Sequence, residues 1–169
     1  PKGIRPLSPV QRVYLKGRNF DPDPLERLWR VQGIGLASKL AWRLFIPIYY
    51  RGEVVSWTTR SIVDDGVRYL SAKPSEEALP HKQLLFGEDY IRHTIIVVEG
   101  PLDCMAIGPG AVATFGLGFS RSQIKKMVRY ARRIIVFDSE FKAQQRAKQL
   151  CSLLTTFPGK TYRVELDAE

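Results

Sequence analysis

Two short apolar runs in the second half of the sequence, residues 95–98 and 134–137, each stop at acidic residues. Short runs of mostly β-branched apolar residues are typical of strands buried on both faces of a parallel sheet. The acids that follow them are Glu99, Asp103, Asp138 and Glu140. Because neighbouring parallel strands end at one edge of a sheet, we expect these carboxylates at the edge where open α/β sheets bind their ligands.

Strand and helix patterns alternate throughout residues 91–169. The expected strands are 94–98, 111–115, 133–137 and 161–166. The expected helices are one near 101–107, one capped by Ser120 or Ser122, and one with Ala143, Ala147, Leu150, Cys151 and Leu154 on its apolar face. This alternation predicts the α/β class, with a parallel sheet flanked by helices.

Residues 1–90 have a different pattern and predict a smaller mixed α/β subdomain. A helix is expected after Ser8 and a second one from Asp21. Antiparallel strands are expected at 43–50, 53–60 and 67–70, with turns at Arg51-Gly52 and Asp64-Asp65-Gly66 between them. Pro47 indicates an edge or a bulge in the first of these strands. Residues 33–39 are left unassigned, and 73–87 are expected to be a loop.

The chain is strongly basic, with 26 Lys and Arg against 17 Asp and Glu and a formal net charge of +9. Both halves are positive, so the charge favours an anionic partner, nucleic acid above all. Residues 111–133 contain no acid and six cations: Arg121, Lys125, Lys126, Arg129, Arg132 and Arg133. This segment is either a solvated helix face or a flank that contacts phosphates.

The two cysteines, Cys104 and Cys151, are too far apart for a CxxC motif. They are expected to be small buried thiols in a reducing cytoplasm, with no zinc site in the chain. The sequence contains neither a signal peptide nor an apolar run of membrane-spanning length. It starts at Pro1, so we expect it to be part of a longer chain.

Each of the four acids also has an ordinary structural explanation. Asp103 suits the first turn of a helix, and Asp138 or Glu140 suits the cap or first turn before Phe141. Together, however, acids that end two successive strands of a basic chain favour a site. Carboxylates placed close together repel one another, and Mg²⁺, which prefers oxygen ligands and phosphate partners, relieves that repulsion.

Three segments of the second half resemble the Toprim domain, which primases, type IA and type II topoisomerases, some nucleases and recombination proteins share. They are Glu99-Gly100-Pro101-Leu102-Asp103, Val112-Ala113-Thr114-Phe115-Gly116 and Ile135-Val136-Phe137-Asp138-Ser139-Glu140. The resemblance implies that Glu99, Asp138 and Glu140 surround a catalytic Mg²⁺ or Mn²⁺. It also implies that Asp103 holds the metal or orients Glu99.

The first half resembles successive blocks of the bacterial and phage DNA primase core of the DnaG type. The blocks are Tyr14-Leu15-Lys16-Gly17-Arg18, Arg43-Leu44-Phe45-Ile46-Pro47-Ile48, Arg60, Arg68-Tyr69-Leu70-Ser71, His81-Lys82 and Leu85-Phe86-Gly87. They occur in the family's order along nearly the whole chain. The resemblance implies that Arg43, Arg60, Arg68 and Lys82 bind the template or nucleotide phosphates. The alternative for each is an ordinary surface cation at a strand end.

The sequence departs from the family's pattern at three places. Arg68 stands where Lys is usual, and a guanidinium grips phosphate differently from an ammonium. Ser71 stands about where the family has Asn. Asp138-Ser139-Glu140 replaces an Asp-x-Asp motif, and the longer Glu140 side chain alters the metal spacing. A further family acid follows the last strand, for which Asp167 and Glu169 are the candidates.

The resemblance implies a DNA primase core with an amino-terminal subdomain at 1–90 and a Toprim subdomain at 91–169. Single-stranded DNA template would lie in a basic cleft between them, and two metal ions would support RNA primer synthesis from NTPs. A replicative or fused helicase and a zinc-binding domain outside this sequence are the implied partners, in the cytoplasm of a bacterial or phage-infected cell. The alternatives are another Toprim enzyme, such as a nuclease or topoisomerase, and a non-catalytic nucleic-acid-binding module.

Overall fold

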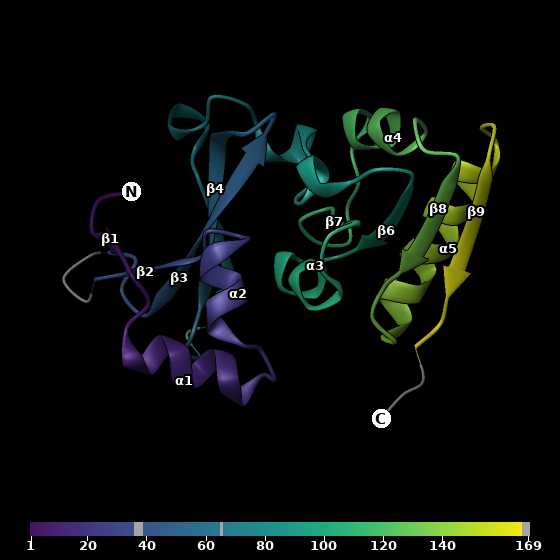
Figure 1. The fold of residues 1–169 in the computed structure, drawn as a ribbon. Coiled ribbons are helices and arrows are strands. Elements are labelled where there is room, and N and C mark those ends of the chain that lie inside the picture. The colour runs from purple at the N-terminus through teal and green to yellow at the C-terminus, as the bar shows by residue number, and fades with distance from the viewer. Residues whose placement is uncertain (36–38, 65, 167–169) are drawn as a thin grey trace. The chain divides into compact units, whose positions relative to one another are not determined.

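The computed structural model describes residues 1–35, 39–64 and 66–166 of the chain (Figure 1). Its internal contacts divide the chain into two units. The first unit comprises residues 1–48 and 54–78, and the second comprises residues 49–53 and 79–169. Among the described residues, no helix is both long enough and apolar enough to cross a membrane.

An antiparallel sheet forms the centre of the first unit. Its strands are β1 (Ile4–Arg5), β2 (Gln32–Ile34), β3 (Arg43–Tyr50), β4 (Glu53–Ser61) and β5 (Tyr69–Ser71), in the order β1-β2-β3-β4-β5. The predicted meander is therefore confirmed, whereas β1 and β2 were not predicted. In β3, Leu44 and Phe45 pair with β2. Pro47 lies beyond these paired residues, so its missing N–H removes no hydrogen bond between β2 and β3. The turn residues Arg51 and Gly52 both have positive φ, as a tight hairpin with a matching twist requires.

Two short helices, α1 (Pro9–Gly17) and α2 (Pro22–Arg27), complete the ordered elements of the first unit together with the 3₁₀ turn η1 (Pro74–Glu76). Ser8 caps α1 as predicted, through a capping box in which the Gln11 side chain accepts from the Ser8 N–H at 2.8 Å. Gln11 is buried and its amide also donates to the Arg43 carbonyl at 2.8 Å, so the cap ties α1 to β3. The core here includes Ile34, Phe45, Trp57 and Ala72. Asp65, in the second predicted turn, lies outside the described residues.

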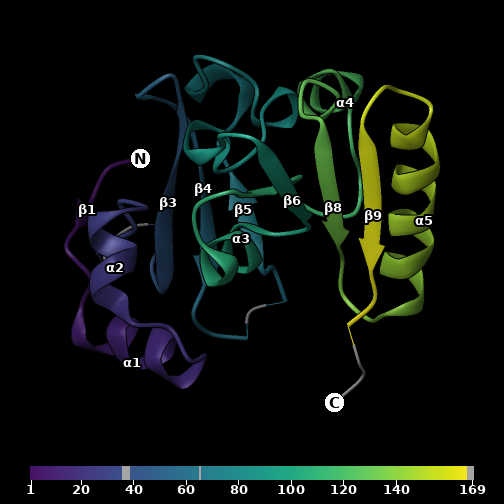
Figure 2. The same cartoon turned by 45° about the vertical axis from the view of Figure 1, so that its right-hand side comes forward.

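The second unit is the predicted parallel sheet with helices. It contains β6 (Thr94–Val98), α3 (Pro101–Ile107), β7 (Ala111–Ala113), α4 (Arg121–Met127), β8 (Arg132–Val136), α5 (Phe141–Thr155) and β9 (Lys160–Val164). The strand order is β7-β6-β8-β9, and β6 pairs in parallel with β7 and β8, as β8 does with β9. Figure 2 shows α5 lying along β8 and β9, and its buried residues Ala143, Ala147, Leu150 and Leu154 join the core formed with the strands and α4. The predicted α/β class is confirmed.

The boundary between the units differs from the predicted one near residue 90. Residues 79–90, which include the 3₁₀ turns η2 (His81–Gln83) and η3 (Glu88–Tyr90), pack with the second unit. Leu85 is fully buried in the core of the second unit, and Phe86 exchanges backbone hydrogen bonds with Ala113 of β7. Apolar contacts that are distant in sequence therefore place this segment, and its turn-rich composition does not reveal them.

The two cysteines differ in burial. Cys104 is buried, as predicted, and its thiol donates to the Ala111 carbonyl at 3.2 Å. Burial raises the pKa of this thiol, which makes it a poor nucleophile. Cys151 is only half-buried on α5, because it flanks the apolar face of the helix and does not lie at its centre.

Candidate active site at the carboxyl edge of the parallel sheet

Glu99 directly follows β6, and the start of α3 fixes the backbone beside it. Gly100 is the N-cap of α3 and Pro101 occupies its first turn. The Asp103 carboxylate accepts a hydrogen bond from the Gly100 N–H at 2.9 Å. Asp103 thus has the first-turn role that its position predicted, and it holds the loop from which Glu99 extends.

Glu99 and Asp138 meet at the ends of neighbouring strands β6 and β8. A Glu99 carboxylate oxygen accepts from the Asp138 backbone N–H at 2.9 Å. The Glu99 carboxyl is half-buried, and burial raises its pKa. The hydrogen bond from the Asp138 N–H lowers this pKa, whereas the negative charges of Asp138, Asp103 and Glu140 raise it further. The four predicted acids therefore share one electrostatic environment. Asp138 and Glu140 are both exposed there.

Gln144, in the first turns of α5, holds the segment that carries Asp138. Its side-chain amide donates to the carbonyls of Phe137 at 3.0 Å and Asp138 at 2.9 Å. Its side-chain oxygen accepts from Arg163 of β9 at 2.6 Å, and Arg163 also pairs with Glu165. Sequence reasoning missed Gln144 and Arg163. The available signal was weak: a polar residue beside the apolar face of a helix, and an arginine in an alternating strand.

Lys82 reaches the same edge of the sheet through the end of β7. Its ammonium donates to the Phe115 carbonyl at 2.6 Å, and the Gly116 N–H donates to the Glu99 carbonyl at 2.8 Å. Partial burial lowers the pKa of Lys82. Phe115 has a positive φ of 62°, a conformation that is uncommon outside glycine and often marks functional loops. Lys82 was predicted in the amino-terminal subdomain, yet it packs within the second unit.

The other three predicted cations belong to the first unit and differ in their availability. Arg43 is only 5% exposed and donates to the Val67 carbonyl at 2.7 Å, so its guanidinium serves the packing of that unit. Arg60 is half-buried, donates to the Tyr14 hydroxyl at 3.2 Å and lies over the Tyr69 ring. Arg68 is exposed. Binding of phosphates by these side chains stays a prediction.

The donor chemistry of this edge suits a hard divalent cation. Carboxylate oxygens are the preferred ligands of Mg²⁺ and Mn²⁺, and a cation would relieve the repulsion that helps to raise the pKa of Glu99. Within the described ranges, no group of three or more His, Cys, Asp or Glu side chains is gathered as a formed metal site. Asp167 and Glu169, the candidates for a last ligand, lie outside the described residues.

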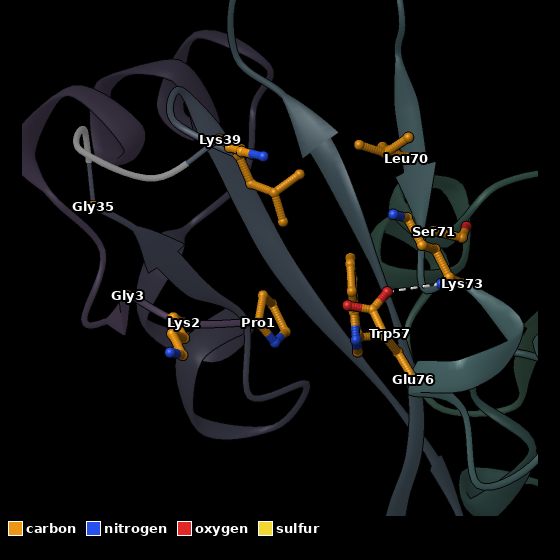
Figure 3. A pocket seen from close by; sticks show the side chains of 11 residues that line it. Pro1, Lys2, Gly3, Gly35, Lys39, Trp57, Leu70, Ser71, Lys73 and Glu76 are labelled. Atoms are coloured by element: carbon orange, nitrogen blue, oxygen red, sulfur yellow. Dashed lines mark hydrogen bonds between the residues drawn. The ribbon is translucent and has the colours of Figure 1, made fainter.

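A pocket of about 720 Å³ lies in the first unit, and the residues that line it are far in sequence from the four acids. Trp57, Leu70 and Ser71 contribute to its wall, and Lys2, Lys39 and Lys73 add positive charge (Figure 3). The Lys73 N–H donates to the Glu76 carboxylate at 2.9 Å, which orders one rim. This pocket could not be predicted from the sequence, because four separate segments assemble its wall.

Curated proteins similar to this chain are bacterial DNA primases. A DNA primase of Synechococcus elongatus is 33% identical over 135 residues, which cover 70% of this chain and 19% of that protein. A DNA primase of Borreliella burgdorferi is 31% identical over 129 residues, which cover 68% of this chain and 24% of that protein. The chain therefore spans about a fifth to a quarter of these relatives. No family model matches the chain.

Solved structures with the same fold are also primases. The DnaG primase catalytic domain bound to single-stranded DNA matches with a TM-score of 0.76 at 20% identity, covering 96% of this chain and 66% of that one. The primase fragment of the bacteriophage T7 primase-helicase matches with a TM-score of 0.64 at 15% identity, covering 100% and 72%. In sequence this chain is similar to bacterial DNA primases, and its fold is similar to that of the DnaG primase catalytic domain.

Proposed function

We propose that this chain is the core of a primase that synthesises short RNA primers on single-stranded DNA. The observation that carries the proposal is the contact between Glu99 and Asp138 at the carboxyl edge of the parallel sheet. Two acids from separate strands meet there, and the charges of Asp103 and Glu140 act on the same carboxyl. Similarity to bacterial DNA primases supports the choice among Toprim-like activities.

Glu99, Asp138 and Glu140 would hold Mg²⁺ or Mn²⁺. Such ions would supply Lewis-acid chemistry, which would activate the primer 3′-hydroxyl for attack on the α-phosphate of an NTP and offset charge on the leaving pyrophosphate. Glu99 must be ionised to ligate, and the Asp138 N–H favours that form by donating to its carboxylate. Gln144 keeps the Asp138 backbone in place through two hydrogen bonds to adjacent carbonyls.

Phosphate groups of the nucleotide and the template are the proposed partners of the cations. Lys82 is held at the end of β7 by the Phe115 carbonyl, at the same edge as Glu99, and suits an NTP phosphate. Arg60 and Arg68 are proposed to contact template phosphates, and Arg43 to support them from the core of the first unit. Two solved structures of the same fold, one of a primase domain bound to single-stranded DNA and one of a primase-helicase fragment, motivate the DNA and helicase partners.

The test is incorporation of labelled NTP on random single-stranded DNA with Mg²⁺ or Mn²⁺. Asp138→Asn and Glu99→Gln should abolish incorporation, while both variants still bind single-stranded DNA. Glu53→Gln makes the same acid-to-amide change at an exposed position on β4 and should retain activity. Full activity of Asp138→Asn would refute the assignment of the metal edge.

A second candidate is a non-catalytic nucleic-acid-binding module. It is favoured by the exposed Glu140 in place of a shorter aspartate. For this candidate the parent chain would bind single-stranded DNA without incorporating NTP, and Mn²⁺ titration would detect no site that depends on Glu99. Nicking of supercoiled DNA in Mg²⁺ would indicate instead another Toprim enzyme.

A further inference from the structure

A second pocket, of about 300 Å³, lies within the second unit. It is lined by Tyr50, Leu79, Gln83, Leu84, Ser122, Lys125, Lys126 and Arg129. None of these residues belongs to the carboxylate edge, and the function proposed above does not use them. They include three of the six cations of the acid-free segment 111–133.

The pocket has an excess of positive charge. Lys126 forms an ion pair with Glu88, and its ammonium lies 4.3 Å from the centre of the Tyr50 ring. Lys125 lies in the last turn of α4, Arg129 lies in the turn after the helix C-cap, and both are exposed and line the pocket. Like charges that line one pocket repel each other, and a bound anion would relieve that repulsion. The segment 111–133 was also interpreted as a solvated helix face, but that interpretation does not explain why these cations line a pocket.

Hydrogen bonds hold the walls of the pocket in place. Gln123, which is fully buried, donates to the carbonyls of Leu84 at 2.8 Å and Thr114 at 3.2 Å, so α4 is tied to the segment after η2. The Asp89 carboxylate accepts from the N–H groups of Arg51 and Gly52 at 2.9 and 2.8 Å. These bonds fix the hairpin tip beside Tyr50. The site is therefore formed before any ligand arrives.

We propose that this pocket binds a phosphate group of single-stranded nucleic acid. Lys125 and Arg129 would supply the charge, and the Ser122 hydroxyl and Gln83 amide would donate hydrogen bonds. A volume of about 300 Å³ suits one nucleotide unit better than an extended acidic peptide, which would need a longer groove. The proposal extends the proposed primase function by a strand contact distinct from the carboxylate edge.

The experiment compares two double variants that each remove two exposed cations from the second unit. Lys125→Gln with Arg129→Gln alters the pocket, whereas Lys148→Gln with Lys160→Gln makes the same change of net charge elsewhere. Binding of a fluorescent oligothymidylate is measured from low to high salt. Each lost phosphate contact lowers the slope of log affinity against log salt by about 0.7, so the pocket variant, which loses one phosphate contact, should lose roughly 0.7 and bind several-fold more weakly at low salt. The control should retain most of the parent slope.

Equal slopes for the two double variants would overturn the proposal. Competition experiments identify the ligand. If excess NTP or pyrophosphate removes the difference in binding between the two double variants, the pocket binds free nucleotides. If only polyglutamate displaces the oligothymidylate, the pocket binds an acidic peptide. Either result contradicts a strand site. The binding measurements are repeated in the Asp138→Asn background. If the pocket variant still lowers the salt slope there, the pocket proposal holds even when NTP incorporation fails. Loss of the pocket effect with normal incorporation would leave the proposed primase function intact.

Discussion

Replacing Gln144 by alanine should destabilise the edge of the sheet that carries Asp138. The change removes two hydrogen bonds, to the carbonyls of Phe137 and Asp138, and the acceptor for Arg163. A neutral hydrogen bond contributes about 1 kcal/mol net, and Arg163 keeps its ion pair with Glu165. We therefore expect the free energy of unfolding to fall by about 1–2 kcal/mol. Urea denaturation followed by circular dichroism measures this change.

Gln149 provides a matched control on the same helix. It accepts a hydrogen bond from Arg146 on the exposed surface of α5, so Gln149→Ala should change stability by less than about 0.5 kcal/mol. Both variants replace glutamine by alanine in one helix, so their difference excludes helix propensity as its cause. Equal stabilities of the two variants would refute the role given to the Gln144 amide.

A metal titration separates positioning from mere stability. If Gln144 holds Asp138 in place for a divalent ion, Gln144→Ala should weaken Mn²⁺ binding while Gln149→Ala leaves it unchanged, as measured by the paramagnetic resonance of free Mn²⁺. In NTP incorporation, saturating Mn²⁺ should restore part of the lost activity. A stability loss without any change in Mn²⁺ affinity would show that Gln144 only supports the fold.

Two further predictions concern stability. Because folding raises the pKa of Glu99 above its ordinary 4.5, its ionisation opposes folding; this cost is absent below pH 4.5 and is complete above the raised pKa. Glu99→Gln should thus raise the melting temperature at neutral pH but not at pH 4, and equal shifts at both would contradict the pKa direction. Gly33→Ala should cost about 1–3 kcal/mol, because its new Cβ would lie 2.2 Å from the side-chain oxygen of buried Gln11. Gly17→Ala, with nothing within 4 Å, should be neutral or slightly stabilising in the same melts.

The second unit could be predicted closely because its local signals agree with its tertiary structure. The strand at 94–98 and the helix at 101–107 have the predicted bounds, since an apolar run, Pro101 and Gly108 mark their ends. β1 and β2 could not be predicted, because two or three residues show no periodicity. They exist through pairings such as Ile4 with Ile34, which are distant in sequence.

The candidate site divides in the same way. The strand ends predicted that Glu99 and Asp138 lie at one edge, since parallel neighbours end together, and their contact bears out that arrangement. Gln144 and Lys82 could not be placed there, because their contacts are with backbone carbonyls. A carbonyl acceptor is present at every residue and leaves no pattern in the sequence.

Burial divides the acid-free segment 111–133 into cations with different roles. Arg133 is fully buried and donates to the Thr161 hydroxyl and the Pro158 carbonyl, and one of its terminal nitrogens has no partner among the described residues. Burial lowers the pKa of Arg133, so its charge is a cost to the fold. Lys126 is neutralised by Glu88. The other four cations, Arg121, Lys125, Arg129 and Arg132, are exposed, and of these Lys125 and Arg129 line the pocket. The net charge therefore predicts the class of partner, while the proposed phosphate contact uses the two exposed cations that line one pocket.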